Sequence, residues 1–135
     1  MSVVLDASVA ISWVCSDESD AFANRVMEKV TEEGGLAPSL WPFEVANIIL
    51  KKERLKRITL DEGKSFLAQL KRLEIRIESA SSSDVLGRTV EVAREYGLTA
   101  YDASYLELAI RLRAPLATLD KKLRDAAAAV GLPSL

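Results

Sequence analysis

The sequence predicts an α/β fold in which a central parallel sheet of four to five short strands lies between two layers of helices. Short apolar runs alternate along the chain with longer segments whose apolar residues recur at helical spacing. Strands and helices that alternate in this way are typical of a parallel sheet covered on both faces. The length of 135 residues is close to the most common domain size, so we expect residues 1–135 to form one domain.

The expected strands are short and are marked by their apolar content or by alternation. Residues 2–6 are an apolar run that ends at an acid, as in a strand buried on both faces. Residues 74–78 alternate charged and apolar side chains, which is the period of a strand. The expected strands are residues 2–6, 36–37, 74–78 and 115–118, and residues 131–135 would supply the fifth strand of a five-stranded sheet.

The expected helices begin and end at residues that favour helix termini. Ser8 is expected to cap the first helix, and Gly34 and Gly97 follow the last periodic residues of two others. Pro42 opens a helix at a first-turn position, where its missing amide hydrogen costs nothing. The expected helices cover residues 8–14, 19–33, 42–54, 60–73, 83–96, 99–113 and 121–129.

Composition excludes several kinds of protein and of site. The chain has no histidine and one cysteine, Cys15, so it cannot build a disulfide framework or a zinc knuckle. No apolar run approaches the ~20 residues of a membrane span, and we expect a cytoplasmic protein. The net charge of -2 argues against a domain that binds duplex nucleic acid through a basic excess.

That charge balance still allows a nuclease. If four acids belong to a metal site, 18 basic residues face 16 remaining acidic ones. Basic residues cluster at 51–57, 71–72 and 121–124. The middle cluster is best explained as a solvated helix face, whereas the last one fits a solvated face and a phosphate-binding surface equally well.

Four acidic residues, each at the end of an apolar run or at the start of a helix, are the strongest indication of function. They are Asp6, Glu44, Asp102 and Asp120. In an open α/β sheet the strand ends and the first turns of the following helices gather at one rim, so acids far apart in sequence can meet there. Without histidine, such a cluster would bind a hard cation, for which Mg²⁺ or Mn²⁺ is the natural candidate.

Each acid also has an ordinary explanation. Thr99 and Asp102 fit the capping-box pattern of a helix start, and Asp120 fits an N-cap. Asp6 can cap a strand end, and Glu44 is a favourable charge near the positive end of a helix. The coincidence of all four positions favours a shared site over four separate caps.

Polar residues beside the acids add to this expectation. Ser8 and Thr118 each lie two residues from one of the acids, and their hydroxyls suit the orientation of carboxylates that hold a metal. Asn47 lies one helical turn after Glu44, where it could hold a water or a phosphate oxygen, although a plain helix hydrogen bond explains it equally well. The candidates for supporting or substrate-contacting roles are therefore Ser8, Thr118, Asn47 and Thr99.

Carboxylates that meet in this way need a cation. Two of them ~5 Å apart repel by roughly 3 kcal/mol at an effective dielectric of about 20. A bound Mg²⁺ would lower the pKa of a water molecule and polarise a phosphoryl oxygen, which indicates phosphodiester hydrolysis. Of the tyrosines nearby, we expect Tyr105 in the core, and Tyr101 fits core packing and base stacking equally well.

Four motifs carry a family resemblance that extends over nearly the whole chain. They are VLDAS at residues 4–8, FEVAN at 43–47, GLTAYDA at 97–103 and LATLD at 116–120. With these motifs in this order, the chain resembles a PIN domain, and within that superfamily the VapC-type toxins of prokaryotic toxin–antitoxin pairs. Between residues 51 and 96 the match is only to a helical pattern.

The resemblance implies a single PIN-like nuclease domain whose four acids bind one or two Mg²⁺ or Mn²⁺ ions. It implies an endoribonuclease that cuts RNA and leaves a 3'-hydroxyl and a 5'-phosphate. It also implies a homodimer and a VapB-type antitoxin, whose C-terminal segment would place a basic side chain in the acidic cleft. Apolar surface for such contacts could come from Trp41, Phe66, Leu67 and Leu70, for which core packing is the stronger expectation.

Two other functions compete with this one. A phosphatase with an aspartyl nucleophile is disfavoured because Asp6 is followed two residues later by Ser8 and not by a second acid, and no glycine-rich phosphate loop is present. A non-catalytic PIN-like scaffold that binds RNA or a protein is the alternative from another class. A degenerate scaffold should have lost an acid, whereas this chain keeps all four.

Overall fold

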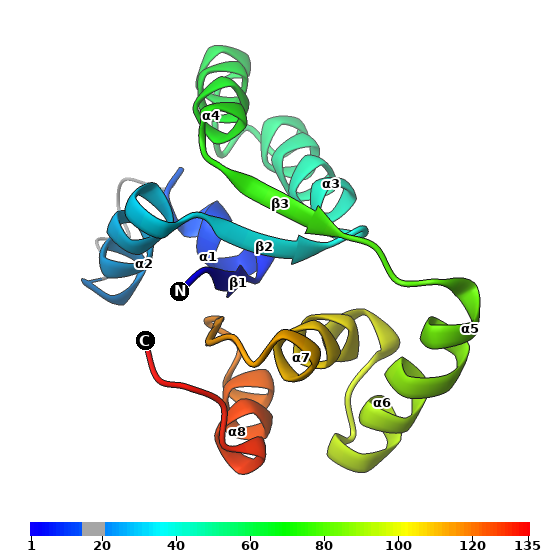
Figure 1. Ribbon diagram of the computed structural model, residues 1–135. Helices are drawn as coiled ribbons and strands as arrows, with labels where there is room; N and C mark the ends of the chain where they lie inside the picture. The colour runs from blue at the N-terminus through cyan, green and yellow to red at the C-terminus, as the bar shows by residue number, and fades with distance from the viewer. Residues whose placement is uncertain (15–20) are drawn as a thin grey trace.

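Four parallel strands form the centre of the molecule, in the order β3-β2-β1-β4 (Figure 1). The structure is a computed structural model that describes residues 1–14 and 21–135. Val3 of β1 is in register with Gly35 of β2, and Val4 is in register with Leu116 of β4. The strands are β1 (Val3–Leu5), β2 (Gly35–Pro38), β3 (Ile75–Glu78) and β4 (Leu116–Ala117).

Helices cover both faces of this sheet. They are α1 (Ala7–Ser12), α2 (Ala21–Glu33), α3 (Trp41–Arg54), α4 (Leu60–Arg72), α5 (Ser82–Asp84), α6 (Val90–Tyr96), α7 (Ala100–Leu112) and α8 (Lys121–Val130), with one π-helical turn, η1 (Val85–Thr89). From β1 to β3 the chain steps across the sheet in one direction, and from β3 to β4 it steps back. Since parallel crossovers are right-handed, α1 to α4 lie on one face and α5 to α7 on the other.

The reversal of direction occurs at β1, which has β2 on one side and β4 on the other. Ligands of open α/β sheets bind outside the carboxyl ends of the strands at such a point. The residues that follow β1 and β4, together with the first turns of the nearby helices, therefore line the expected crevice.

The core is centred on β1 and α7. All three residues of β1 are fully buried, and so are Tyr105 and Leu106 on α7, which packs along β2, β1 and β4. Trp41, Phe66 and Leu70 are also core residues, as expected. Within residues 1–14 and 21–135, no helix is long and apolar enough to cross a membrane.

The expected parallel sheet and its first four strands are confirmed, but the fifth strand at 131–135 is wrong. That segment pairs with no strand. Gly131 ends α8 in the left-handed conformation, and the Leu132 amide donates back to the Ala127 carbonyl, as at a glycine-terminated helix. Pro133 lacks the amide hydrogen that a sheet would require.

Two helix predictions also need correction. Ser8 does not cap α1, because the helix begins at Ala7 and the Ser8 hydroxyl is bonded to Asp6 instead. The helix expected at 83–96 begins at Ser82 and is interrupted by the π-helical turn. Residues 19–20 of the expected helix 19–33, like Cys15, lie outside the described residues.

Candidate functional site

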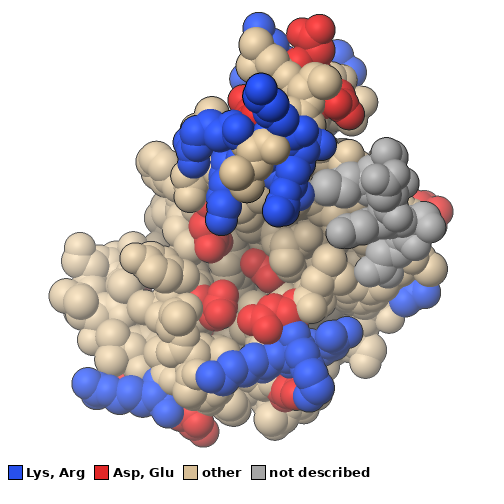
Figure 2. Space-filling model, turned by 180° about the vertical axis from the view of Figure 1, so that it is seen from behind, with Lys and Arg blue, Asp and Glu red and all other residues tan. Residues whose placement is uncertain are grey.

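The four acids come from four different elements and meet at the carboxyl end of the sheet. Asp6 directly follows β1, Glu44 lies in the first turn of α3, Asp102 in the first turn of α7, and Asp120 is the N-cap residue of α8. Electrostatic interactions join Asp6 to Glu44 and to Asp102, and Asp102 to Asp120. Figure 2 shows acidic side chains gathered in a hollow with basic side chains on either side.

Asp6 is the most firmly held of the four carboxylates. The hydroxyl of Ser8 donates to its Oδ2 at 2.8 Å, and the hydroxyl of Thr118 donates to the same oxygen at 2.6 Å. Asp6 is 8% exposed and Thr118 is 1% exposed, so water cannot easily replace these bonds. Both recorded bonds go to one oxygen, and they fix the direction in which the other oxygen points.

Backbone amides extend this network to α8. The Leu119 amide donates to the Ser8 hydroxyl oxygen at 3.1 Å, and the Asp120 amide donates to the Thr118 hydroxyl oxygen at 3.0 Å. Each hydroxyl therefore accepts from the β4–α8 connection while it donates to Asp6. The structure thus places both hydroxyls on Asp6, and that they support a metal ligand stays a prediction.

Glu44 has a partner that sequence reasoning placed only in the core. The phenol of Tyr105, which is fully buried, donates a short hydrogen bond to Glu44 Oε1. Burial and the neighbouring Glu44 carboxylate raise the pKa of Tyr105 well above its ordinary value, so the phenol keeps its proton. Tyr105 lies three residues after Asp102 on α7, and this helical spacing was the available signal that both face one side.

Two of the carboxylates resist ionisation in the metal-free protein. Burial raises the pKa of Glu44, and the charges of Asp6 and Asp102 raise it further, against the opposing effect of the Tyr105 hydrogen bond. Burial also raises the pKa of Asp102, together with the charges of Asp6 and Asp120, whereas Lys122 lowers it. The site therefore has an excess of negative charge.

The helix-capping explanation accounts for Asp102 only in part. The Thr99 hydroxyl accepts from the Asp102 amide at 3.1 Å and so caps α7. In the complete capping box of α4, the Glu62 carboxylate also accepts from the Thr59 amide. No such return bond to the Asp102 carboxylate occurs among the described residues, so that carboxylate is available to the hollow.

The alternatives to a site role were an N-cap for Asp120 and a plain helix hydrogen bond for Asn47, and the two residues differ in the structure. Asp120 does cap α8, since its Oδ1 accepts from the Lys122 amide at 3.2 Å. It nevertheless lies close enough to Asp102 to affect the pKa of that residue. Asn47 is exposed, and no hydrogen bond joins it to the acids within the described part of the chain.

The donor atoms suit a hard divalent cation, but their present arrangement is open. Within residues 1–14 and 21–135, no three acidic or cysteine side chains stand in a geometry that could already hold a metal ion. The donors that the site offers, which are carboxylate oxygens supported by hydroxyls, are those that Mg²⁺ and Mn²⁺ prefer.

Comparison with known proteins places the chain in a family. The model of the PIN domain matches residues 3–129. Ribonuclease VapC3 of Pyrobaculum aerophilum is 30% identical over 125 residues, which cover 93% of this chain and 94% of that protein.

Solved structures share the fold. The sarcin-ricin loop cleaving toxin VapC20 of Mycobacterium tuberculosis has a TM-score of 0.66 at 14% identity, with 99% of this chain and 98% of that chain covered. A toxin–antitoxin complex from Klebsiella pneumoniae gives a TM-score of 0.61 at 18% identity, with 90% and 88% covered. The family model and the 30% identical relative together show that the chain belongs to the PIN-domain family and, within it, to the VapC-type proteins.

Proposed function

We propose that this protein is an Mg²⁺- or Mn²⁺-dependent endoribonuclease, the toxin of a VapBC-type toxin–antitoxin pair, and that residues 1–135 act as one nuclease domain. The observation that carries the proposal is the convergence of Asp6, Glu44, Asp102 and Asp120, with two hydroxyls on Asp6, at the switch point of the sheet. The relative named as a ribonuclease covers nearly the whole chain, which supports RNA as the substrate.

The four carboxylates would hold the metal. When bound, the ion supplies a water of lowered pKa and a positive charge beside the scissile phosphate. Asp6 would be a ligand of fixed orientation, because Ser8 and Thr118 hold it. Tyr105 would keep Glu44 in place and favour its ionised form.

We also propose an antitoxin partner, which the same charge distribution supports. An acidic hollow attracts a basic side chain, and an arginine would pair with carboxylates through two parallel hydrogen bonds. One of the structures with this fold is a toxin–antitoxin complex, which supports a VapB-type antitoxin for this chain. Such a partner would inhibit by occupying the place of the metal and the RNA.

We further propose that the pair acts in the cytoplasm, where a single cysteine remains reduced.

We also propose a homodimer. A largely apolar groove beside the site, between the end of β2, the π-helical turn and α7, is lined by Leu40, Val85, Tyr101 and Leu108. Leu86 next to it is 75% exposed and Tyr101 is 67% exposed. A second copy could cover this surface. Sedimentation velocity at micromolar concentration should show a dimer that Leu86→Glu converts to a monomer, whereas a monomeric wild type would contradict the proposal.

The deciding experiment is cleavage of a mixed RNA pool by the purified protein in Mg²⁺, Mn²⁺ or EDTA. Asp6→Asn and Asp102→Asn should each reduce cleavage by at least the roughly 10–100-fold that loss of a supporting residue causes at metal sites. The exposed Asp61 on α4 offers a matched control, since Asp61→Asn removes the same charge away from the hollow. Cleavage that survives EDTA would refute the metal mechanism.

The same variants test the non-catalytic alternative. If the protein were only a scaffold, the wild type would bind RNA or its partner without cutting in any metal. If it is the proposed enzyme, Asp6→Asn should lose cleavage while its binding of RNA largely survives.

A further inference from the structure

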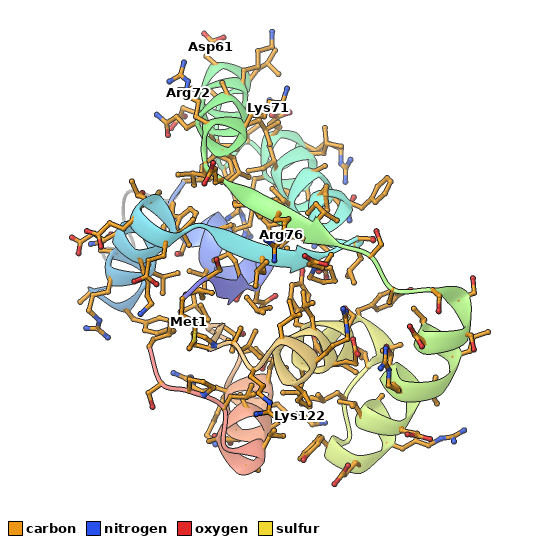
Figure 3. The ribbon with its side chains drawn as sticks, in the orientation of Figure 1. Met1, Asp61, Lys71, Arg72, Arg76 and Lys122 are labelled. Atoms are coloured by element: carbon orange, nitrogen blue, oxygen red, sulfur yellow. The ribbon has the colours of Figure 1, made fainter. Side chains whose placement is uncertain are left out.

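Lys122 is a basic side chain that lies close to Asp102 and so to the acid hollow. It is exposed in the first turn of α8, two residues after Asp120 (Figure 3). A Cβ atom built on Gly97 would lie 3.7 Å from its Nζ atom, so the ammonium group rests on the turn between α6 and α7. That turn leads directly into Asp102, whose pKa the charge of Lys122 lowers.

Gly97 forms the turn beside which the ammonium group lies. Its φ of +65° belongs to the left-handed region, which a residue with a side chain rarely adopts. A Cβ atom here would meet the Lys122 Nζ atom at 3.7 Å, an ordinary van der Waals contact, so the backbone of the turn and not the lysine requires the glycine. The ammonium group of Lys122 thus lies against the backbone of the α6–α7 turn.

The adjacent lysine provides a contrast. Lys121 Nζ forms an ion pair with Asp125 at 2.6 Å, one helical turn further along α8. Lys122 forms no ion pair within 4 Å among the described residues, although it interacts electrostatically with Asp102. Its three N–H donors therefore remain largely available to a ligand.

A polyanionic substrate cannot approach four carboxylates without positive charge beside them. A lysine ammonium is a compact point charge that suits a single phosphate group. Figure 2 shows that basic side chains border the hollow on this side, where α8 begins. The phosphate adjacent to the one that is cut would come within reach of such a group.

We propose that Lys122 is a substrate-binding residue that holds a backbone phosphate of single-stranded RNA beside the acid hollow. This inference rests on the proposed ribonuclease function, and it assigns to one side chain a contact that does not depend on base identity. Lys122 would contribute to the affinity for RNA of any sequence, and Lys121 would not.

The test compares Lys122→Gln with Lys121→Gln in the Asp6→Asn background, in which no cutting is expected. The probe is a short single-stranded RNA of random sequence with a fluorescent label, and fluorescence anisotropy gives the affinity across a range of salt concentrations. Lys122→Gln should weaken binding roughly five- to tenfold and make the salt dependence of log K shallower by about 0.7. Lys121→Gln should change neither, and Lys122→Arg should restore the salt dependence.

Two results would overturn the inference. Equal effects of Lys122→Gln and Lys121→Gln would mean that only the general charge of α8 matters. Unchanged RNA binding in that background, together with tighter Mg²⁺ binding when Lys122→Gln is made in the protein that retains Asp6, would mean that the lysine is only a counterion of Asp102. Because binding is measured without cleavage, these results are distinct from failure of the ribonuclease proposal, which a wild type that cuts no RNA would indicate.

Discussion

The phenol of Tyr105 donates a hydrogen bond to the carboxylate of Glu44, 61 positions away in the sequence. This bond joins the core helix α7 to the first turn of α3. Since it favours the charged form of Glu44, it opposes the burial that raises the pKa of that residue. A buried residue that packs as part of the core thus also sets the protonation of the site.

Tyr105→Phe should therefore move the acidic limb of the pH–cleavage profile to higher pH. Loss of the hydrogen bond leaves burial and the charges of Asp6 and Asp102 to raise the pKa of Glu44 unopposed. The folded state should lose about 1 kcal/mol, as is typical of one lost hydrogen bond. The exposed Tyr101 supplies the control, because Tyr101→Phe should leave the pH profile unchanged. An unshifted profile in Tyr105→Phe would show that Glu44 ionises independently of the phenol.

The sequence was sufficient to predict the four-stranded sheet and the positions of the four acids beside strand ends and helix starts, because both depend on local patterns. That the four acids hold a metal stays a prediction. Apolar runs set the strands, and each acid stands beside a strand end or a helix start. The pattern at 131–135 failed because Leu132 turns back onto α8, an interaction that strand propensity does not include. Tyr105 was assigned to the core alone, since a buried aromatic looks the same in sequence whether or not its hydroxyl has a partner.

The local sequence pattern likewise did not predict that the Asp102 carboxylate makes no capping bond. The pattern of residues 99–102 predicts a capping box, but the box is incomplete there, whereas the one at residues 59–62 is complete. The two pairs differ in the acid, since Glu62 is one methylene longer than Asp102 and reaches back to the N-cap amide. The charges near Asp102 come from Asp6 and Asp120, which are distant in the chain.

Thr118→Val should weaken both the fold and the site. Valine keeps the shape of threonine but cannot donate to Asp6 Oδ2 or accept from the Asp120 amide. An unsatisfied buried polar group costs about 1–3 kcal/mol, and loss of a residue that orients a metal ligand costs roughly 10–100-fold in metal affinity or activity. Thermal denaturation with and without Mg²⁺ measures both effects. Thr31→Val is the control, because among the described residues the exposed Thr31 hydroxyl bonds only the Met27 carbonyl.

Asp102→Asn should stabilise the metal-free protein at neutral pH. The pKa of Asp102 is raised in the folded state, so the protonated form is favoured on folding. The resulting stability is present below the ordinary pKa of 3.8 and is lost as the pH rises through the higher folded value. Removal of the charge should therefore raise the free energy of unfolding by about 0.5–2 kcal/mol at neutral pH. The measurement is the free energy of unfolding in EDTA against pH, and a wild type more stable than the variant at neutral pH would contradict it.

Mg²⁺ should stabilise the wild type more strongly as the pH rises from about 4 to 7, because protons and metal compete for the same carboxylates. Glu44 and Asp102 retain their protons to higher pH than ordinary carboxyls, since the pKa of each is raised. A ligand that binds only the folded state adds about 2.7 kcal/mol to the free energy of unfolding when its concentration is 100 times its Kd. Melting midpoints with Mg²⁺ or EDTA at several pH values give the difference directly. Asp61→Asn should behave like the wild type, and Asp102→Asn should lose most of the gain. A gain that is equal at all pH values would show that the ion binds elsewhere than at these carboxylates.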